Sequence, residues 1–286
     1  MKNLIAYPDP AVFLNGAAGL LQLARDNSHA YRSNSPFPHI VFRDFFDPVL
    51  LKEVLKEFPD LSTVEDAYKF DNHNEKKLAA RGESRFGPAT KCLMHYLNSE
   101  PVLNFLQELT GIEEPLIPDP YFIGGGYHEI KPGGLLKVHA DFNKNRLTKL
   151  DRRINLLVYL NQDWEESYGG HFELWNKEMT HAEKRILPDF NTVAIFSTTD
   201  FSYHGHPNPL TCPPDRSRKS LALYYYTNGR PESEIDRRQE EHSTLFVGRK
   251  GVKTDVRHQT FKFSDLVTLG KNWLPPVIYN RLKRLK

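Results

Sequence analysis

Six short apolar segments between residues 120 and 227 constrain the fold more than any other feature of this sequence. Each is rich in branched and aromatic residues, and glycine, proline or asparagine separates it from its neighbours. The segments are YFIGGGYHEI, LLKVHAD, INLLVYLN, GGHFELW, NTVAIFS and SLALYYYT. Short strands interrupted by turn residues are typical of an antiparallel sandwich or barrel. The sequence therefore predicts a mainly β core over residues 119–228.

Helical patterns lie on both sides of this predicted core. An apolar stripe over residues 50–58 follows Asp47-Pro48, which supplies a cap and a first-turn proline. A second stripe covers residues 102–109, and Gly111 is placed to end that helix. A third stripe follows Pro275-Pro276, and the basic residues beside it are typical of a solvated helix face.

These patterns predict one α+β domain over residues 1–286. Residues 1–118 are expected to form a helical support region, and residues 229–286 a mostly helical C-terminal extension. A chain of 286 residues can bury a substantial core without disulfide bonds. Its two cysteines, Cys92 and Cys212, match no disulfide framework or metal-binding pattern.

Charge and hydropathy narrow the expected partners. The net charge is +2, so the sequence predicts no polyanionic partner such as a nucleic acid. The N-terminus does not resemble a signal peptide, and no apolar stretch approaches the roughly 20 residues that a membrane span needs. We therefore expect a cytoplasmic protein without a membrane span, and its oligomeric state stays open.

Two histidines and one carboxylate suggest a metal site. His139 and Asp141 are two residues apart in a predicted strand, so their side chains share one face. The segment TDFSYHGHPNPL offers His204 or His206 as a third ligand. Such a facial triad leaves coordination positions open, as in Fe(II) oxygenases. Because the chain has 12 histidines, the pair alone is weak evidence, and most such histidines are surface or core residues.

The segment after these histidines offers a candidate anion-binding residue. Strand alternation places Arg218 on one face of RSRKSLALYYYT and Lys219 on the other. An inward arginine in an apolar barrel needs an anion, and its guanidinium suits the distal carboxylate of 2-oxoglutarate. The alternative is an ordinary ion pair at the barrel rim with one of the 36 acidic residues.

Over roughly residues 36–227 the chain resembles the prolyl-hydroxylase-like family of Fe(II)/2-oxoglutarate-dependent oxygenases. The resemblance rests on the opening PFPHIVFRDFF, on the order of the six segments, and on YLN-x-DW followed by Gly-Gly between the two histidine segments. It implies a double-stranded β-helix, a jelly roll flanked by N- and C-terminal helices. Carried over residue by residue, it implies the metal ligands His139, Asp141 and His204. It also implies Arg218 as the residue that binds 2-oxoglutarate, with Tyr159 and Tyr127 in the same pocket.

His204 is preferred over His206 because the family has a glycine next to its ligand, and because Gly205 and Pro207 suggest that the strand bends away there. The implied cofactors are Fe(II), 2-oxoglutarate as co-substrate and dioxygen, with ascorbate as a further candidate. The implied reaction hydroxylates an aliphatic C–H bond and converts 2-oxoglutarate to succinate and carbon dioxide. No catalytic residue is expected beyond the ligands of the metal and the co-substrate.

The substrate stays open between a peptidyl or prolyl residue and a small molecule, because likeness in the catalytic core does not transfer substrate. The basic loop over residues 142–152 either closes over an acidic or peptidic substrate or is simply solvated. Two other functions compete with the oxygenase. One is a cupin-like module that binds a divalent metal without oxygenase activity, and the other is an interaction protein on a degenerate barrel.

Overall fold

The fold is seen in a computed structural model that describes residues 19–235 and 241–255. Residue contacts divide the chain into residues 1–250 and residues 251–286, and every site discussed below lies in the first unit. The helix predicted after Pro275-Pro276 lies outside the described residues. Within those residues, no helix is both long and apolar enough to cross a membrane.

Twelve antiparallel strands form one sheet in the described part of the chain. Ten of them follow the order β1-β9-β6-β11-β4-β3-β5-β10-β7-β8, while β2 pairs with β3 and β12 with β5. Their bounds are β1 His39–Phe42, β2 Tyr68–Asp71, β3 Glu75–Ala80, β4 Gly126–Ile130, β5 Leu135–Ala140, β6 Asp151–Tyr159, β7 Phe172–Trp175, β8 Ala182–Ile186, β9 Thr192–Ser197, β10 His204–His206, β11 Arg218–Thr227 and β12 Leu245–Phe246. The six predicted segments correspond to β4, β5, β6, β7, β9 and β11.

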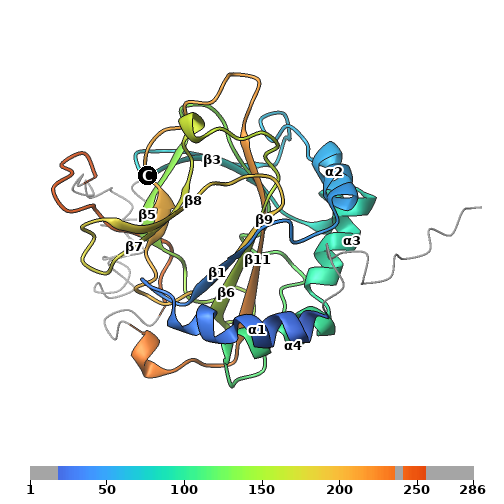
Figure 1. Ribbon diagram of the computed structural model, residues 1–286. Coiled ribbons are helices and arrows are strands. Elements are labelled where there is room, and N and C mark those ends of the chain that lie inside the picture. Colours follow the sequence, from blue (N-terminus) through green and yellow to red (C-terminus); the bar gives the residue numbers. More distant parts are fainter. Residues whose placement is uncertain (1–18, 236–240, 256–286) are drawn as a thin grey trace, which may run out of the picture. The chain divides into compact units, whose positions relative to one another are not determined.

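The helices lie beside the half of the sheet that contains β1, β6 and β11 (Figure 1). They are α1 Leu20–Ser33, α2 Pro48–Glu57, α3 Pro88–Leu97 and α4 Glu100–Thr110, and short 3-10 turns occur at Glu83–Arg85, Glu166–Tyr168 and Glu232–Glu234. Asp47 caps α2 by accepting hydrogen bonds from the backbone N–H groups of Val49 and Leu50, as predicted. Gly111 ends α4 in the left-handed conformation, with φ of +69°.

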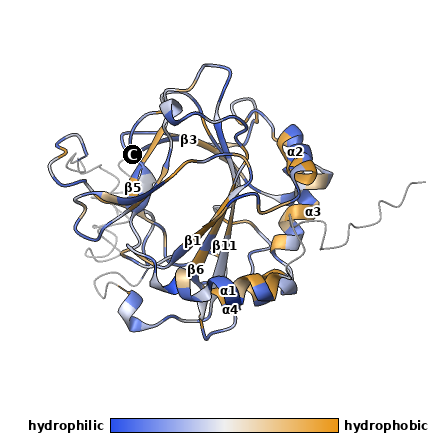
Figure 2. Cartoon of the chain, in the orientation of Figure 1, coloured by the Kyte–Doolittle hydropathy of each residue, from blue (hydrophilic) through white to orange (hydrophobic). Residues whose placement is uncertain are grey.

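The main hydrophobic core lies between these helices and one face of the sheet. Figure 2 shows α3 and α4 as largely hydrophobic, whereas the connecting loops are mostly hydrophilic. Leu221, Leu223 and Tyr225 of β11 belong to this core. The alternate residues Ala222 and Tyr224 pack in a separate cluster on the opposite face. The predicted alternation of β11 is therefore present, and one face of the sheet remains available for a functional site.

Six strands lie outside the six predicted segments, and three of them lie within residues 1–118. β2 and β3 are rich in charged residues and largely solvent-accessible, so they lack the apolar pattern that marks a buried strand. β3 is nevertheless central to the topology, because it pairs with both β4 and β5 and so connects the two halves of the sheet. The N-terminal region thus contributes strands as well as helices.

Candidate metal centre

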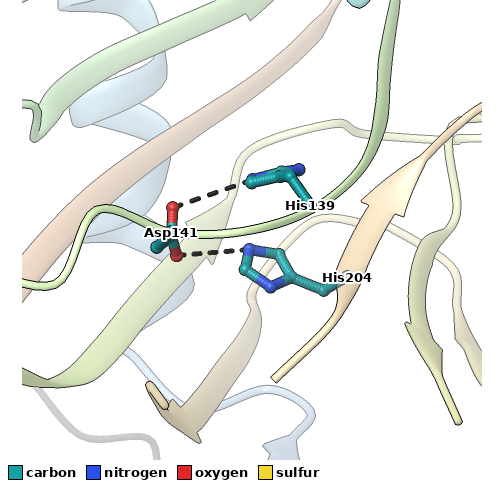
Figure 3. A group of neighbouring side chains, drawn as sticks. All are labelled: His139, Asp141 and His204. Carbon is teal, nitrogen blue, oxygen red and sulfur yellow. Dashed lines mark ion pairs between the residues drawn. The ribbon is translucent and has the colours of Figure 1, made fainter. Parts of the chain in front are cut away.

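His139, Asp141 and His204 form a compact group where β5 lies beside β10 (Figure 3). β5 and β10 pair in a register that sets His204 directly opposite His139. Asp141 follows His139 by two residues and lies just beyond the end of β5. One potential ligand atom from each residue lies within 4.8 Å of the other two. The structure therefore brings together the three residues proposed from the sequence.

The imidazole rings present their Nε2 atoms to the carboxylate. His139 Nε2 lies 3.7 Å from one Asp141 oxygen, and His204 Nε2 lies 3.3 Å from the other. On the far side of each ring, Nδ1 lies 2.8 Å from the carbonyl of Lys137 in His139 and 2.9 Å from that of Ser202 in His204. These carbonyls fix the proton on Nδ1, which leaves Nε2 with a free lone pair. This is the tautomer that a metal-binding histidine requires.

The surroundings favour a neutral His139 and an ionised Asp141. Burial lowers the pKa of His139, and the neighbouring His204 lowers it further. Burial opposes ionisation of Asp141, but Arg152, His204 and His139 together hold its pKa well below the usual value. A neutral imidazole and a carboxylate are the forms that bind a divalent cation.

Arg152 and Asn155 of β6 hold the Asp141 carboxylate in place. Arg152 Nη2 lies 3.1 Å from Asp141 Oδ2, and Asn155 donates a 2.7 Å hydrogen bond from Nδ2 to the same oxygen. Arg152 also donates from Nε to Asn155 Oδ1. Neither residue was anticipated from the sequence. They orient the carboxylate in the way that outer-shell groups position metal ligands.

Arg218 is a buried cation without an acidic partner. Its Nε donates a 2.7 Å hydrogen bond to the Gly170 carbonyl, and its Nη2 donates to the Tyr159 hydroxyl at 3.2 Å. Among the described residues, no carboxylate lies within ion-pairing distance of this guanidinium, although Arg218 is only 7% exposed. Since a buried charge is normally paired, the Arg218 guanidinium suits an anionic ligand. Arg218 and Tyr159 are thus brought together as predicted.

Gly170 explains part of the Gly-Gly motif. Its φ is +70°, and a Cβ atom there would lie 2.5 Å from Leu210 Cδ2 and 3.0 Å from Arg218 Cδ. A side chain at this position would therefore strain the backbone and displace the arginine. The glycine lets its carbonyl approach Arg218 closely.

His206 lies outside the group of three but is also buried. β10 continues through this residue, so the expectation that the strand bends away at Gly205 is wrong. The register of the pairing between β10 and β5 shifts within β10 instead. His204 lies opposite His139, whereas His206 lies opposite Leu136. Among the described residues, no side chain bonds to either ring nitrogen of His206, and the ring has a polar contact with the backbone of Asn208. Burial and the nearby Arg218 hold its pKa well below the usual value, so the ring is neutral.

Tyr127 requires a correction, because it does not reach this site. It lies opposite Leu221 in the pairing of β4 with β11, so both side chains point into the main core. Its hydroxyl donates to Thr90 Oγ1, and its ring packs against Phe58 and Phe86. The prediction chose the wrong face of β4.

Sequence comparison supports the predicted resemblance. The family model of the 2OG-Fe(II) oxygenase superfamily matches residues 125–226, which contain the three clustered residues and Arg218. The central part of this chain is thus similar to that superfamily, and the resemblance predicted from the sequence is confirmed.

Relatives agree with this oxygenase assignment. The prolyl 3,4-dihydroxylase OGFOD1 of Ostreococcus tauri is 23% identical over 252 residues, covering 78% of this chain and 44% of that protein. The chain thus spans less than half the length of this curated relative.

Two solved prolyl hydroxylases share the oxygenase fold. One, from Trichoplax adhaerens in complex with a hypoxia inducible factor peptide, has a TM-score of 0.53 and 17% identity over 73% of this chain and 90% of its own. The other, a prolyl-4-hydroxylase of Pseudomonas putida, has a TM-score of 0.51 and 15% identity over 73% of this chain and 100% of its own. The predicted double-stranded β-helix is therefore confirmed, whereas the roles of individual residues stay predictions.

Proposed function

We propose that this chain is an Fe(II)- and 2-oxoglutarate-dependent dioxygenase that hydroxylates an aliphatic C–H bond. The observation that carries the proposal is the group of His139, Asp141 and His204, whose ligand atoms lie within 4.8 Å of one another. In this proposal the three residues hold Fe(II). Two imidazoles and one carboxylate are a donor set that suits this ion and leaves coordination positions for a co-substrate and dioxygen.

The buried Arg218 supports 2-oxoglutarate as the co-substrate. Its guanidinium is fixed by Gly170 and Tyr159 but lacks a counter-ion among the described residues. A carboxylate of 2-oxoglutarate would supply that charge through charge-assisted hydrogen bonds. We assign Tyr159 and the ring of His206, whose nitrogens bond to no described side chain, to the same pocket. When bound, iron and 2-oxoglutarate supply the oxidising chemistry.

The residues of this chain then have binding and positioning roles. Arg152 and Asn155 orient Asp141, while the backbone carbonyls of Lys137 and Ser202 orient the two imidazoles. Phe196 and Phe172 pack against His204, with ring centroids 4.7 and 5.6 Å away. These apolar contacts exclude water from one side of the metal centre. For the substrate we propose a peptidyl or prolyl residue or a small molecule, since the Trichoplax relative was solved with a peptide.

The activity is tested by measuring succinate release from 2-oxoglutarate in the presence of Fe(II) and dioxygen, with pools of peptides, amino acids and sugars as acceptors. A hydroxylated acceptor formed together with succinate is the expected result. The cupin-like alternative is tested by adding Fe(II) and 2-oxoglutarate without oxygen. An oxygenase gives a weak visible charge-transfer band, whereas a module that binds metal alone gives no band and no succinate.

His204 and His206 provide a sharper test of the site. We expect His204→Ala to lose iron binding, since it removes one of three ligands. His206→Ala should retain the metal but bind 2-oxoglutarate more weakly, because His206 lies outside the group of three and its ring nitrogens bond to no described side chain. Iron content after gel filtration and the apparent affinity for 2-oxoglutarate distinguish the two effects. Loss of iron from the His206 variant alone would transfer the ligand role to His206.

A further inference from the structure

A large cavity opens beside the proposed metal centre. Its volume is about 750 Å³, and Asp141 forms part of its wall. Further lining residues come from β2, β3, the loop after β5 and residues 241–244. Cavities of this size accommodate ligands of drug-like dimensions. Arg218, Tyr159 and His206, which we assign to the co-substrate, do not line this cavity, so its lining bears on the nature of the main substrate.

Positive charge predominates in this lining. The cationic side chains are Lys77, Arg81, Lys144, Arg146 and Arg152, and the carboxylates are Glu75, Asp141 and Glu241. Each carboxylate already has a cationic partner, because Glu75 pairs with Lys77, Asp141 with Arg152, and Glu241 with Lys149.

Two of these cations form no ion pair with any residue that the structure describes. Within the described ranges, no carboxylate forms an ion pair with Arg81 or Arg146, and Arg81 instead lies over the Tyr68 ring at 5.2 Å. Asp151 forms an ion pair with Lys144 and not with either of these arginines. Arg146 therefore offers an unpaired guanidinium to a ligand, and Arg81 offers a second one that interacts with Asp119 only electrostatically, without forming an ion pair.

Arg152 adds a buried donor at the inner end of the cavity. It is 1% exposed, and its guanidinium lies over the rings of Tyr224 and Phe142, at 3.4 and 4.3 Å from their centroids; the two rings are nearly perpendicular to each other. Its Nη2 contacts Asp141, whereas its Nη1 has no hydrogen-bond partner. A buried donor of this kind normally has an acceptor. Because the side chain is held rigidly by two rings, Nη1 is prepared to bind an oxygen atom of a ligand.

We propose that the main substrate carries an anionic group, a carboxylate or a phosphate, which Arg81 and Arg146 recognise, while Arg152 Nη1 binds an oxygen atom nearer the metal. This inference rests on the proposed function, since it concerns the substrate of that reaction. Guanidinium groups bind carboxylate and phosphate oxygens in pairs and with fixed geometry. The aromatic side chains Tyr68, Phe70, Phe142 and Tyr224 line the same cavity and give the apolar part of such a substrate a surface to pack on.

The experiment compares acceptors that differ only in charge. The probes are short proline peptides with glutamate or glutamine beside the proline, N-acetylproline and its amide, and a phosphoserine peptide with its serine counterpart. Binding is measured by calorimetry on the protein loaded with Zn(II) and 2-oxoglutarate, and turnover is measured with Fe(II). We expect the anionic member of at least one pair to bind about tenfold more tightly, and the pair that responds identifies the source of the anion.

Variants test whether the arginines of the cavity cause the preference for anionic acceptors. Arg81→Ala combined with Arg146→Ala should remove most of the preference, whereas Arg25→Ala should leave it unchanged. Arg25 is an exposed arginine on α1 that does not line the cavity. Equal binding of charged and neutral partners in every pair, or a preference that survives in the double variant, would overturn the inference. Failure of the proposed function looks different, because it leaves no 2-oxoglutarate turnover with any acceptor.

Discussion

We expect Asp141→Ala to abolish 2-oxoglutarate turnover and to weaken iron binding by more than about a hundredfold. The change removes the only carboxylate of the proposed metal centre. Loss of groups that merely orient metal ligands already costs about 10- to 100-fold in affinity, so loss of a ligand costs more. Iron content after desalting and succinate release measure the two effects. A variant that binds Fe(II) as well as the parent and still decarboxylates 2-oxoglutarate would refute the role of Asp141.

Folding needs a control in this experiment, because Asp141 also neutralises the buried Arg152. Removing one member of a buried ion pair destabilises a protein by about 3–5 kcal/mol. The double variant Asp141→Asn with Arg152→Leu removes both charges together and avoids the unpaired cation. It should have an unfolding temperature closer to that of the parent and still lack iron. Circular dichroism during heating separates loss of the fold from loss of the metal.

We expect Arg218→Ala to weaken 2-oxoglutarate binding by roughly thirty- to several-thousand-fold and to leave iron binding intact. The variant would leave the co-substrate carboxylate in a poorly solvated pocket without its cationic partner, at a cost of about 2–5 kcal/mol. At about 1.4 kcal/mol per factor of ten, this corresponds to the stated range. Arg218→Lys should be intermediate, because lysine keeps the charge but loses the paired donors. The measurement is the dependence of succinate formation on 2-oxoglutarate concentration.

Lys219→Ala is the matched control for this prediction. Lys219 is the next residue of β11, but its ammonium group contacts Ser217 and Glu129. Glu129 retains Lys131 as a partner at 3.0 Å in the variant. We therefore expect little change in the apparent affinity for 2-oxoglutarate. A large effect at Lys219 with none at Arg218 would show that the wrong face of β11 was assigned to the pocket.

Local patterns predicted the sheet core and most of the clustered residues. His139 and Asp141 could be paired because side chains two residues apart in a strand share a face, and Arg218 followed from the same rule. The rule does not say, however, which of the two faces of a strand points toward the pocket. In β4, buried residues occur on both faces, so the sequence alone does not show that Tyr127 points away from the pocket.

Arg152 was missed for a different physical reason. Alternation from Tyr159 through Asn155 would place Arg153 on the side of the metal centre. The pairing of β6 with β11 shifts between Tyr225 and Tyr226, and this irregularity turns Arg152 toward Asp141 instead. A bulge of this kind inserts a residue into the alternation and changes which side chains face inward. It depends on the partner strand, which local sequence does not specify.

The short strand β12 brings residues 245–247 next to the proposed metal centre. Leu245 and Phe246 pair with Ala140 and His139, where β3 no longer covers β5. The Phe246 ring lies 5.6 Å from that of His139, and Val247 continues the pairing by donating its N–H to the Val138 carbonyl. A protein cut at residue 228, the end of the region predicted as the core, would lose this cover. The edge of β5 would then be exposed to water beside a metal ligand, and unpaired strand edges promote aggregation. Truncated versions of this chain should therefore end beyond residue 247.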